Sequence, residues 1–131
     1  MRSRFPRSKP ASSQQRGLRA EKIAAWLLRL KGYHVLAERY RAGSGEIDIL
    51  AMKGRTLVAV EVKARARSEQ LMESITPHKQ ARIASAMATL IANDHKIAGL
   101  TSRRIDTMRF DVVYIAPRRW PVHIRDAWRI S

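Results

Sequence analysis

The chain has 131 residues, with 26 lysines and arginines against 11 aspartates and glutamates, and no cysteine. This length predicts one domain, and 45% hydrophobic residues exclude a wholly disordered chain. The absence of cysteine excludes disulfides, a thiol nucleophile and cysteine-ligated zinc or iron–sulfur centres. A net charge of +15 favours a polyanionic partner, nucleic acid above all, with an anionic membrane surface as the alternative.

The beginning of the chain differs in composition from the rest. Its first nineteen residues hold six arginines and lysines and no acid, and Pro6 and Pro10 interrupt any long helix there. We expect a flexible basic arm over residues 1–15, with a transit peptide as the less favoured interpretation, and a single domain over 16–131. No apolar stretch approaches the ~18–20 residues of a membrane-spanning helix, so we expect a soluble, cytoplasmic protein that does not act in a membrane.

Hydrophobic periodicity and turn residues predict the elements of the domain. A helix runs from Leu18 and ends at Gly32; strands cover 33–41, 46–52 and 55–65, the last two joined by a hairpin at Lys53-Gly54; a helix begins at Thr76-Pro77 and reaches Asn93; a loop covers 94–104; a strand covers 108–115; and a short strand-like end covers 122–128. The order α-β-β-β-α-β predicts an α/β domain in which an antiparallel meander is joined through a crossover helix to a fourth, parallel strand.

The predicted hairpin brings acidic residues together. With Lys53-Gly54 as a two-residue loop, Asp48 lies opposite Ala59 and Glu46 lies opposite Glu61. Because side chains alternate between the two faces of a strand, all three carboxylates project from one face. Like charges directly opposite one another destabilise a sheet, so this arrangement favours a functional site.

Carboxylates gathered without histidine or cysteine favour a hard cation, Mg²⁺ or Mn²⁺, over zinc. We expect Asp48 and Glu61 to bind that ion. Lys63 follows Glu61 by two residues on the same face and is expected to orient an attacking water or to stabilise a phosphorane-like transition state. The alternative interpretation is an ordinary hairpin with one solvated face, a common origin of charges that alternate with valines.

The segments GEIDIL at 45–50 and VEVKAR at 60–65 resemble the YraN family of small bacterial proteins. That family is assigned to the PD-(D/E)XK nuclease superfamily and is related to archaeal Holliday junction resolvases. The resemblance extends over roughly residues 16–115. It implies a restriction-endonuclease-like α-β-β-β-α-β core with a mixed central sheet flanked by helices. It also implies a metal-dependent endonuclease that acts on branched or structured DNA.

The resemblance assigns roles residue by residue. It makes Asp48 and Glu61 the metal ligands, with the carbonyl of Val62 as a third, and Lys63 the catalytic lysine. Glu21 matches the acidic residue on the first helix of resolvase-like members. Three further residues are expected to contact nucleic acid, DNA rather than RNA: Arg65, Lys79 and Gln80. A homodimer is left open, because resolvase-like relatives are often dimers.

A non-catalytic nucleic-acid-binding module that keeps the same fold is the alternative function. Asp111 is expected to be a structural hydrogen-bond acceptor or ion-pair partner. The pairs Arg103-Arg104 and Arg118-Arg119 are interpreted as phosphate contacts or as solvated surface. The tryptophans are expected to pack in the protein rather than to stack on bases: Trp26, Trp120 and Trp128.

Overall fold

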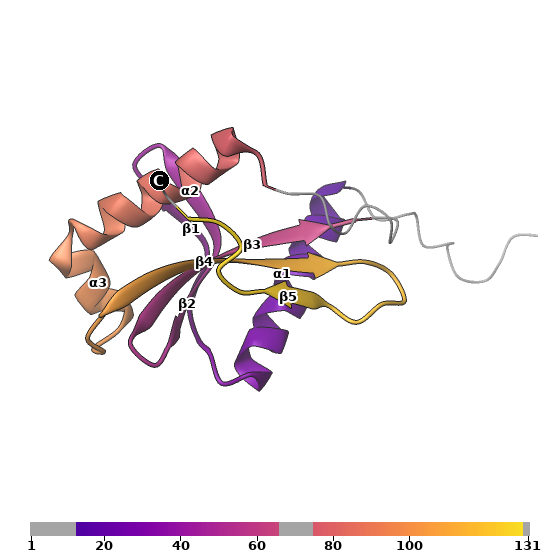
Figure 1. Ribbon diagram of the computed structural model, residues 1–131, viewed down its shortest axis with the longest axis horizontal. Helices are drawn as coiled ribbons and strands as arrows, with labels where there is room; N and C mark the ends of the chain where they lie inside the picture. Colours follow the sequence, from indigo (N-terminus) through magenta and orange to yellow (C-terminus); the bar gives the residue numbers. More distant parts are fainter. Residues whose placement is uncertain (1–12, 66–74, 130–131) are drawn as a thin grey trace, which may run out of the picture.

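The computed structural model describes residues 13–65 and 75–129, which form three helices and five strands. In chain order these are α1 (Ser13–Leu30), β1 (His34–Ala42), β2 (Gly45–Lys53), β3 (Thr56–Ala64), α2 (Pro77–Ile91), α3 (Asp94–Leu100), β4 (Thr107–Ile115) and β5 (Val122–Ile124). The predicted α-β-β-β-α-β order is confirmed, α3 is added to it, and β5 forms the first part of the strand-like end predicted over 122–128 (Figure 1).

The strands form one mixed sheet in the order β1-β2-β3-β4-β5. Neighbouring strands are antiparallel except β3 and β4, which are parallel and are joined through α2 and α3. A parallel pair needs such a crossover, because a tight turn can only join antiparallel neighbours. The α/β class with a mixed central sheet is therefore as the sequence predicts.

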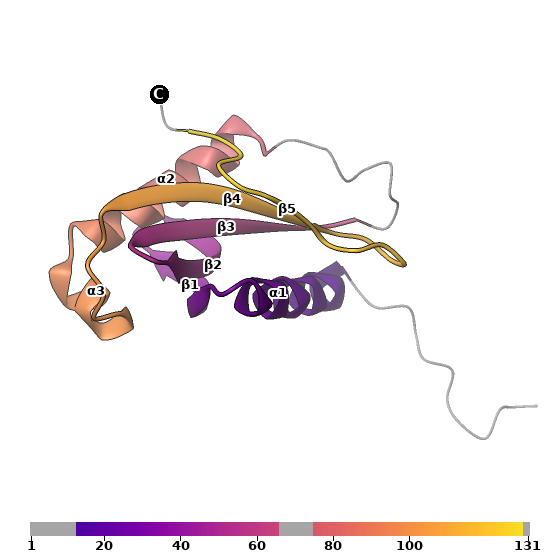
Figure 2. The same ribbon diagram turned by 60° about the horizontal axis from the view of Figure 1, so that its bottom comes forward.

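Helices cover both faces of the sheet, with α1 on one side and α2 on the other (Figure 2). On β2 and β3, Ile49, Val58 and Val60 pack in the cluster that includes α1. Leu50 and Leu57 pack instead in the cluster that includes α2. Alternating residues of the two strands therefore contribute to the cores on both sides of the sheet. Both α1 and α2 reach the end of the sheet at which β3 and β4 finish (Figures 1 and 2).

The hairpin register differs from the predicted one by two residues. The loop is Gly54-Arg55, so Lys53 pairs with Thr56, and Leu50 rather than Asp48 lies opposite Ala59. Gly54 has a φ of 59°, a left-handed conformation that glycine adopts easily and that suits a two-residue hairpin loop. A slip of two residues preserves the predicted alternation, while a slip of one would have reversed it. Ile47 is the exception, because alternation places it on the same face as Ile49 but it packs on the α2 side.

Two other boundaries differ from expectation. Helix α1 begins at Ser13, so residues 13–15 of the predicted arm have helical backbone, and residues 1–12 lie outside the described residues. The segment predicted as a loop at 94–104 contains α3 instead. Ile97 and Leu100 of this short helix are three residues apart and both pack against the core on the α2 side. Tertiary packing stabilises a helix here that is too short for a clear sequence pattern.

The prediction for the tryptophans is wrong for two of the three. Trp26 is 57% exposed and Trp120 is 85% exposed, whereas Trp128 stacks on Phe110 with ring centroids 4.1 Å apart. Trp26 lies two residues after Ala24, which is completely buried against the sheet, and so it faces away from the core. Within residues 13–65 and 75–129, no helix is both long and apolar enough to cross a membrane.

Candidate active site

The site begins where β2 and β3 separate. Backbone pairing between these strands runs from Lys53–Thr56 to Ile49–Val60. One residue beyond that last pair, a carboxylate oxygen of Asp48, Oδ2, accepts a hydrogen bond from the backbone N–H of Val62 at 2.9 Å. The carboxylate of Asp48 therefore takes the place of a backbone carbonyl as the hydrogen-bond acceptor for β3, and this hydrogen bond fixes the carboxylate beside β3.

Glu61 is the second carboxylate of the site, and its side chain is only 3% exposed. Its Oε1 lies 2.7 Å from Nζ of Lys79 on α2. Its Oε2 is buried and has no hydrogen-bond partner among the described residues. A buried polar atom without a partner has a free-energy cost of about 1–3 kcal/mol, so this oxygen is poised to accept a proton or a cation.

The surroundings of Glu61 change its ionisation. Burial raises the pKa of Glu61 to about 8, and the negative charge of Asp48 acts in the same direction. The ammonium group of Lys79 opposes both effects by stabilising the ionised form. The pKa of Glu61 therefore depends on the charge of Asp48, because little water lies around Glu61 to screen one carboxylate from the other.

Lys79 reaches Glu61 because of the way in which α2 begins. Thr76 is the N-cap and its side chain accepts from the N–H of Lys79, with Pro77 at the first helical position, as predicted. A lysine in the first turn of a helix is electrostatically unfavourable, and the ion pair with Glu61 offsets this. The sequence assigned Lys79 to nucleic acid, and its side chain, 50% exposed, remains partly open to solvent.

Glu21 on α1 lies at the margin of the site. Its Oε2 accepts from Nε of Arg39 at 2.8 Å, and Arg39 itself has a φ of 55°, in the left-handed region that few non-glycine residues adopt. Burial raises the pKa of Glu21 and the charge of Asp48 raises it further, against the lowering effect of Arg39. Nothing in the sequence indicated Arg39, which lies within an unremarkable predicted strand.

Val62 and Lys63 follow Glu61 along β3. Val62 packs toward the core on the α1 side. Alternation then places Lys63 on the same face as Glu61, and its side chain is half-buried.

Two residues assigned to nucleic acid make local contacts. The amide of Gln80 donates to the backbone carbonyl of Ile75 at 3.0 Å. Nη1 of Arg65 donates to the carbonyl of Ala64 at 3.1 Å. Both hydrogen bonds hold the side chain near the site end of the sheet, and the contacts of both residues with nucleic acid stay predictions.

Glu46 does not lie opposite Glu61, so that part of the prediction is wrong. It pairs with Arg41 of β1, and the closest ion-pair distance between these two side chains is 3.9 Å. The two-residue shift of the hairpin register and the end of pairing at Ile49–Val60 together remove the expected Glu46–Glu61 contact. The carboxylate pair of the site is Asp48 with Glu61.

This pair fits a hard cation. Among the described residues, no group of three or more histidine, aspartate or glutamate side chains is placed to hold a metal ion. Two carboxylates are nevertheless a usual protein contribution to Mg²⁺, which keeps several waters and takes further oxygens from substrate. The unpartnered Oε2 of Glu61 and the all-oxygen donor set meet that requirement, and the carbonyl of Val62 is the third candidate ligand.

Gly45, the first residue of β2, has a role that the sequence did not indicate. A Cβ atom at this position would lie 2.1 Å from the carbonyl oxygen of Arg82 and 2.8 Å from the backbone nitrogen of Ala86, both on α2. The absent side chain therefore lets α2 lie directly on the start of β2. This close approach holds the two elements that carry Asp48 and Lys79 together.

Comparison with known proteins identifies the family of the chain. Residues 20–115 match the model of Uncharacterised protein family UPF0102. The chain belongs to this family. The resemblance to the YraN family is thereby confirmed, since the two names denote one family. The matched range contains the whole candidate site, from Glu21 to Gln80.

Similar UPF0102 proteins extend over most of this chain. The one from Parvibaculum lavamentivorans is 48% identical over 113 residues, which are 86% of this chain and 80% of the relative. That from Methylorubrum extorquens is 41% identical over 126 residues, 96% of this chain and 94% of the relative. That from Paramagnetospirillum magneticum is 42% identical over the full length of both chains.

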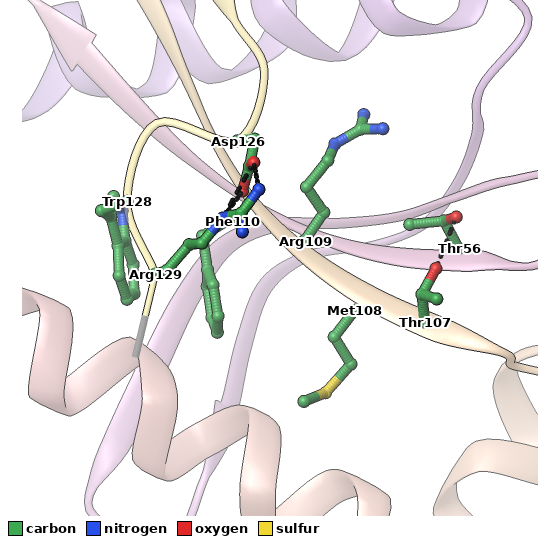
Figure 3. A pocket seen from close by; sticks show the side chains of 8 residues that line it. All are labelled: Thr56, Thr107, Met108, Arg109, Phe110, Asp126, Trp128 and Arg129. Carbon is green, nitrogen blue, oxygen red and sulfur yellow. Dashed lines mark hydrogen bonds and ion pairs between the residues drawn. The ribbon is translucent and has the colours of Figure 1, made fainter. Parts of the chain in front are cut away.

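This UPF0102 chain has a cavity of about 420 Å³ beside the first half of β4. Figure 3 shows Phe110 and Trp128 side by side, Asp126 joined to Arg129, and Arg109 pointing to the opposite side of β4. None of the predicted site residues lines this cavity, so the candidate active site lies elsewhere.

Asp111 follows these residues on β4 and is completely buried. It accepts two hydrogen bonds from Arg109, at 2.8 and 2.9 Å, one from His123 at 2.8 Å and one from the N–H of Asp126 at 3.0 Å. Burial alone would raise the pKa of Asp111, but these hydrogen bonds outweigh it and lower the pKa to about 2. The UPF0102 chain thus uses Asp111 as the structural acceptor that its sequence predicted.

Proposed function

We propose that this UPF0102 protein is a metal-dependent endonuclease-like phosphodiester hydrolase that acts on nucleic acid, DNA rather than RNA. The observation that carries the proposal is the Asp48–Glu61 carboxylate pair, in which one buried oxygen has no partner among the described residues. A pair of close acids on buried β-structure destabilises a protein unless a cation or a proton lies between them. The net charge of +15 supplies the attraction for a polyanionic substrate.

Asp48 and Glu61, with the carbonyl of Val62, would hold Mg²⁺ or Mn²⁺. A divalent ion held there would supply Lewis-acid chemistry, polarising the phosphodiester and activating a water. The protein positions the ligands in advance, since the N–H of Val62 fixes Asp48 and Lys79 fixes Glu61. Such prior positioning reduces the reorganisation needed during the reaction.

Lys63 and Glu21 are the groups that would handle the proton and the developing charge. The Lys63 ammonium lies on the same face of β3 as Glu61 and can donate to the attacking water or to a phosphate oxygen. Glu21 has a raised pKa and a fixed partner in Arg39, which suits it to accept a proton next to Asp48. Both roles rest on position beside the carboxylate pair.

The test is cleavage of plasmid DNA and of a four-way junction in Mg²⁺ and in Mn²⁺. Asp48→Asn and Lys63→Met are each expected to lower the cleavage rate by about 100-fold or more, since each removes a group that acts on the reacting atoms. Asp106→Asn, at an exposed aspartate of the α3–β4 connection, is the matched control and should change the rate less than about twofold. Equal cleavage by wild type and Asp48→Asn would point to a contaminating nuclease and defeat the proposal.

One observation favours the second candidate, a non-catalytic nucleic-acid-binding module. The Lys79 ammonium already neutralises Glu61 at 2.7 Å without any ion. That candidate requires DNA binding in EDTA that survives Asp48→Asn, together with no cleavage by the wild type in either metal. Metal-dependent cleavage that Asp48→Asn abolishes would rule it out.

A further inference from the structure

A second concave surface lies on the α1 side of the sheet, at the ends of β3 and β4. It has a volume of about 560 Å³, within the usual range for sites that bind one small ligand. The cavity, called the arginine groove here, is lined by Arg19, Ala20, Ile23, Ala64, Arg65, Ile115, Ala116, Pro117, Arg118, Arg119 and Pro121. These residues come from α1, from the end of β3 and from the end of β4 with the turn that follows it (Figures 1 and 2).

The lining combines two chemical characters. Its apolar part consists of alanine, isoleucine and proline side chains, among which Ile23 is 41% exposed although it is a large hydrophobic residue. Its charged part consists of four arginines, and no acid of the described ranges 13–65 and 75–129 lines the cavity. Within the described residues, Arg19, Arg118 and Arg119 make no ion pair. A ligand for the arginine groove therefore carries both an apolar portion and negative charge.

The turn that supplies two of the arginines holds one of them, Arg118, in an unusual backbone conformation. Arg118 has a φ of 59°, in the left-handed region that disfavours a residue with a Cβ atom. Such local strain is typical of functional sites, where surrounding structure over-determines the backbone. Trp120 lies between the lining residues Arg119 and Pro121 in the chain and is 85% exposed, although it is not itself among the lining residues.

We infer that the arginine groove binds one unpaired nucleotide of a nucleic-acid strand. The base of a nucleotide offers a flat face for the apolar lining and for guanidinium stacking, and the phosphates beside it accept paired hydrogen bonds from arginine. A base inside a duplex is stacked on both sides and cannot enter a cavity of this size, so the ligand needs a single-stranded segment. A second copy of the chain is a poor occupant, because both surfaces would be strongly basic.

The inference deepens the proposed function and rests on it for the source of the strand. Ala64 of the groove follows Glu61 by three residues of β3, about 10 Å at the usual rise of a strand. Residues of α1 line the groove, whereas Glu61 contacts Lys79 of α2, so a bound strand would pass around the end of β3. The substrate class is then nucleic acid in which unpaired nucleotides adjoin the scissile bond.

The experiment measures equilibrium binding in EDTA to a blunt DNA duplex and to the same duplex with a single-stranded tail. The groove variant is Arg118→Ala with Arg119→Ala. The matched control is Arg103→Ala with Arg104→Ala, an adjacent arginine pair at the opposite end of β4 that removes the same charge. A third variant, Ile23→Gln, alters the apolar lining at a partly exposed position without changing the charge.

The wild type is expected to prefer the tailed duplex, and both double variants are expected to bind the blunt duplex less tightly because each loses two charges. The preference for the tail should fall about tenfold in the groove variant and in Ile23→Gln only, because only these variants remove contacts with the unpaired nucleotide. No tail preference in the wild type, or an equal preference in the groove and control variants, would overturn the inference. Binding to anionic vesicles that only the groove variant loses, without a tail preference, would instead assign the groove to a lipid headgroup.

The result is separable from the proposed function, because EDTA removes any metal-dependent reaction. If Asp48→Asn abolishes cleavage while the groove variant keeps the tail preference of the wild type, only the arginine groove inference fails. If the tail preference depends on the groove but no metal supports cleavage, only the hydrolase proposal fails.

Discussion

At the scale of single residues, burial and a neighbouring carboxylate change the ionisation of Glu61. Its carboxyl lies almost entirely out of water, one of its oxygens lacks a partner among the described residues, and Asp48 adds a second negative charge nearby. Lys79 neutralises part of this charge, so the ionised state is tolerated rather than favoured. The free energy of unfolding in the absence of metal should therefore respond to pH through Glu61.

In EDTA, the ionisation of Glu61 is expected to reduce stability as pH rises. The folded-state pKa of about 8 lies above the ordinary value of 4.5, so the folded protein binds more protons than the unfolded one between these limits. The contribution is fully present below about pH 4.5 and is lost by about pH 8. Glutamine stays neutral at both pH values. The free energy of unfolding of Glu61→Gln, relative to that of the wild type, should therefore rise by about a few kcal/mol from pH 5 to pH 8, measured by urea unfolding. A difference that is constant with pH would contradict this explanation.

Sequence reasoning at the residue scale predicted part of the site. That Asp48 and Glu61 belong to neighbouring strands follows from alternation and from the hairpin turn, which are local properties of the chain. The contact of Glu61 with Lys79 depends on how α2 packs after a connection that includes residues 66–74, and no local pattern encodes it. The sequence therefore indicated the carboxylates but assigned Lys79 to a different partner.

At the scale of elements, the contact of β2 with α2 depends on a missing side chain. Gly45→Ala places a Cβ atom 2.1 Å from a backbone oxygen of α2, and backbone cannot move aside cheaply. We expect Gly45→Ala to destabilise the protein by about 1–3 kcal/mol or more, measured by urea unfolding. Gly17→Ala is the control, because nothing lies within 4 Å of a Cβ there and α1 should gain about 0.5–1 kcal/mol. Equal effects of the two substitutions would contradict the close packing of α2 on β2.

Strands β4 and β5 are held together through Asp111. Asp111→Asn leaves Arg109 without its buried counter-charge, so we expect a loss of about 3–5 kcal/mol at pH 7. Since hydrogen bonds lower the folded-state pKa to about 2 from 3.8, the stabilisation by Asp111 is present above pH 3.8 and is lost as pH falls toward 2. The difference between wild type and Asp111→Asn in urea unfolding should shrink between pH 5 and pH 2.5.

Asp106→Asn provides the comparison, because its ion pairs are exposed and should contribute less than about 1 kcal/mol. If Asp111→Asn were no more destabilising than Asp106→Asn, the network around Asp111 would not stabilise the edge of the sheet.

At the scale of the whole molecule, the net charge of +15 should dominate the affinity for nucleic acid. We expect the logarithm of the duplex DNA binding constant in EDTA to fall linearly with the logarithm of salt concentration, by about 0.9 for each phosphate contacted. The measurement is a titration by fluorescence anisotropy at several salt concentrations. An affinity that does not depend on salt would remove the electrostatic basis of both candidate functions, and tight binding to anionic vesicles at the same salt would favour the membrane alternative.

The sequence by itself determined the order of the core elements, the face on which most residues of β2 and β3 lie, the cap of α2 and the excess of positive charge. These properties depend on residues close together in the chain or on composition. Only the tertiary structure decided that Lys79 meets Glu61, that Trp26 and Trp120 remain exposed, and that arginines from three separate segments line one groove. The physical reason is that such contacts join segments far apart in the chain, whose meeting depends on the packing of both helices against the finished sheet.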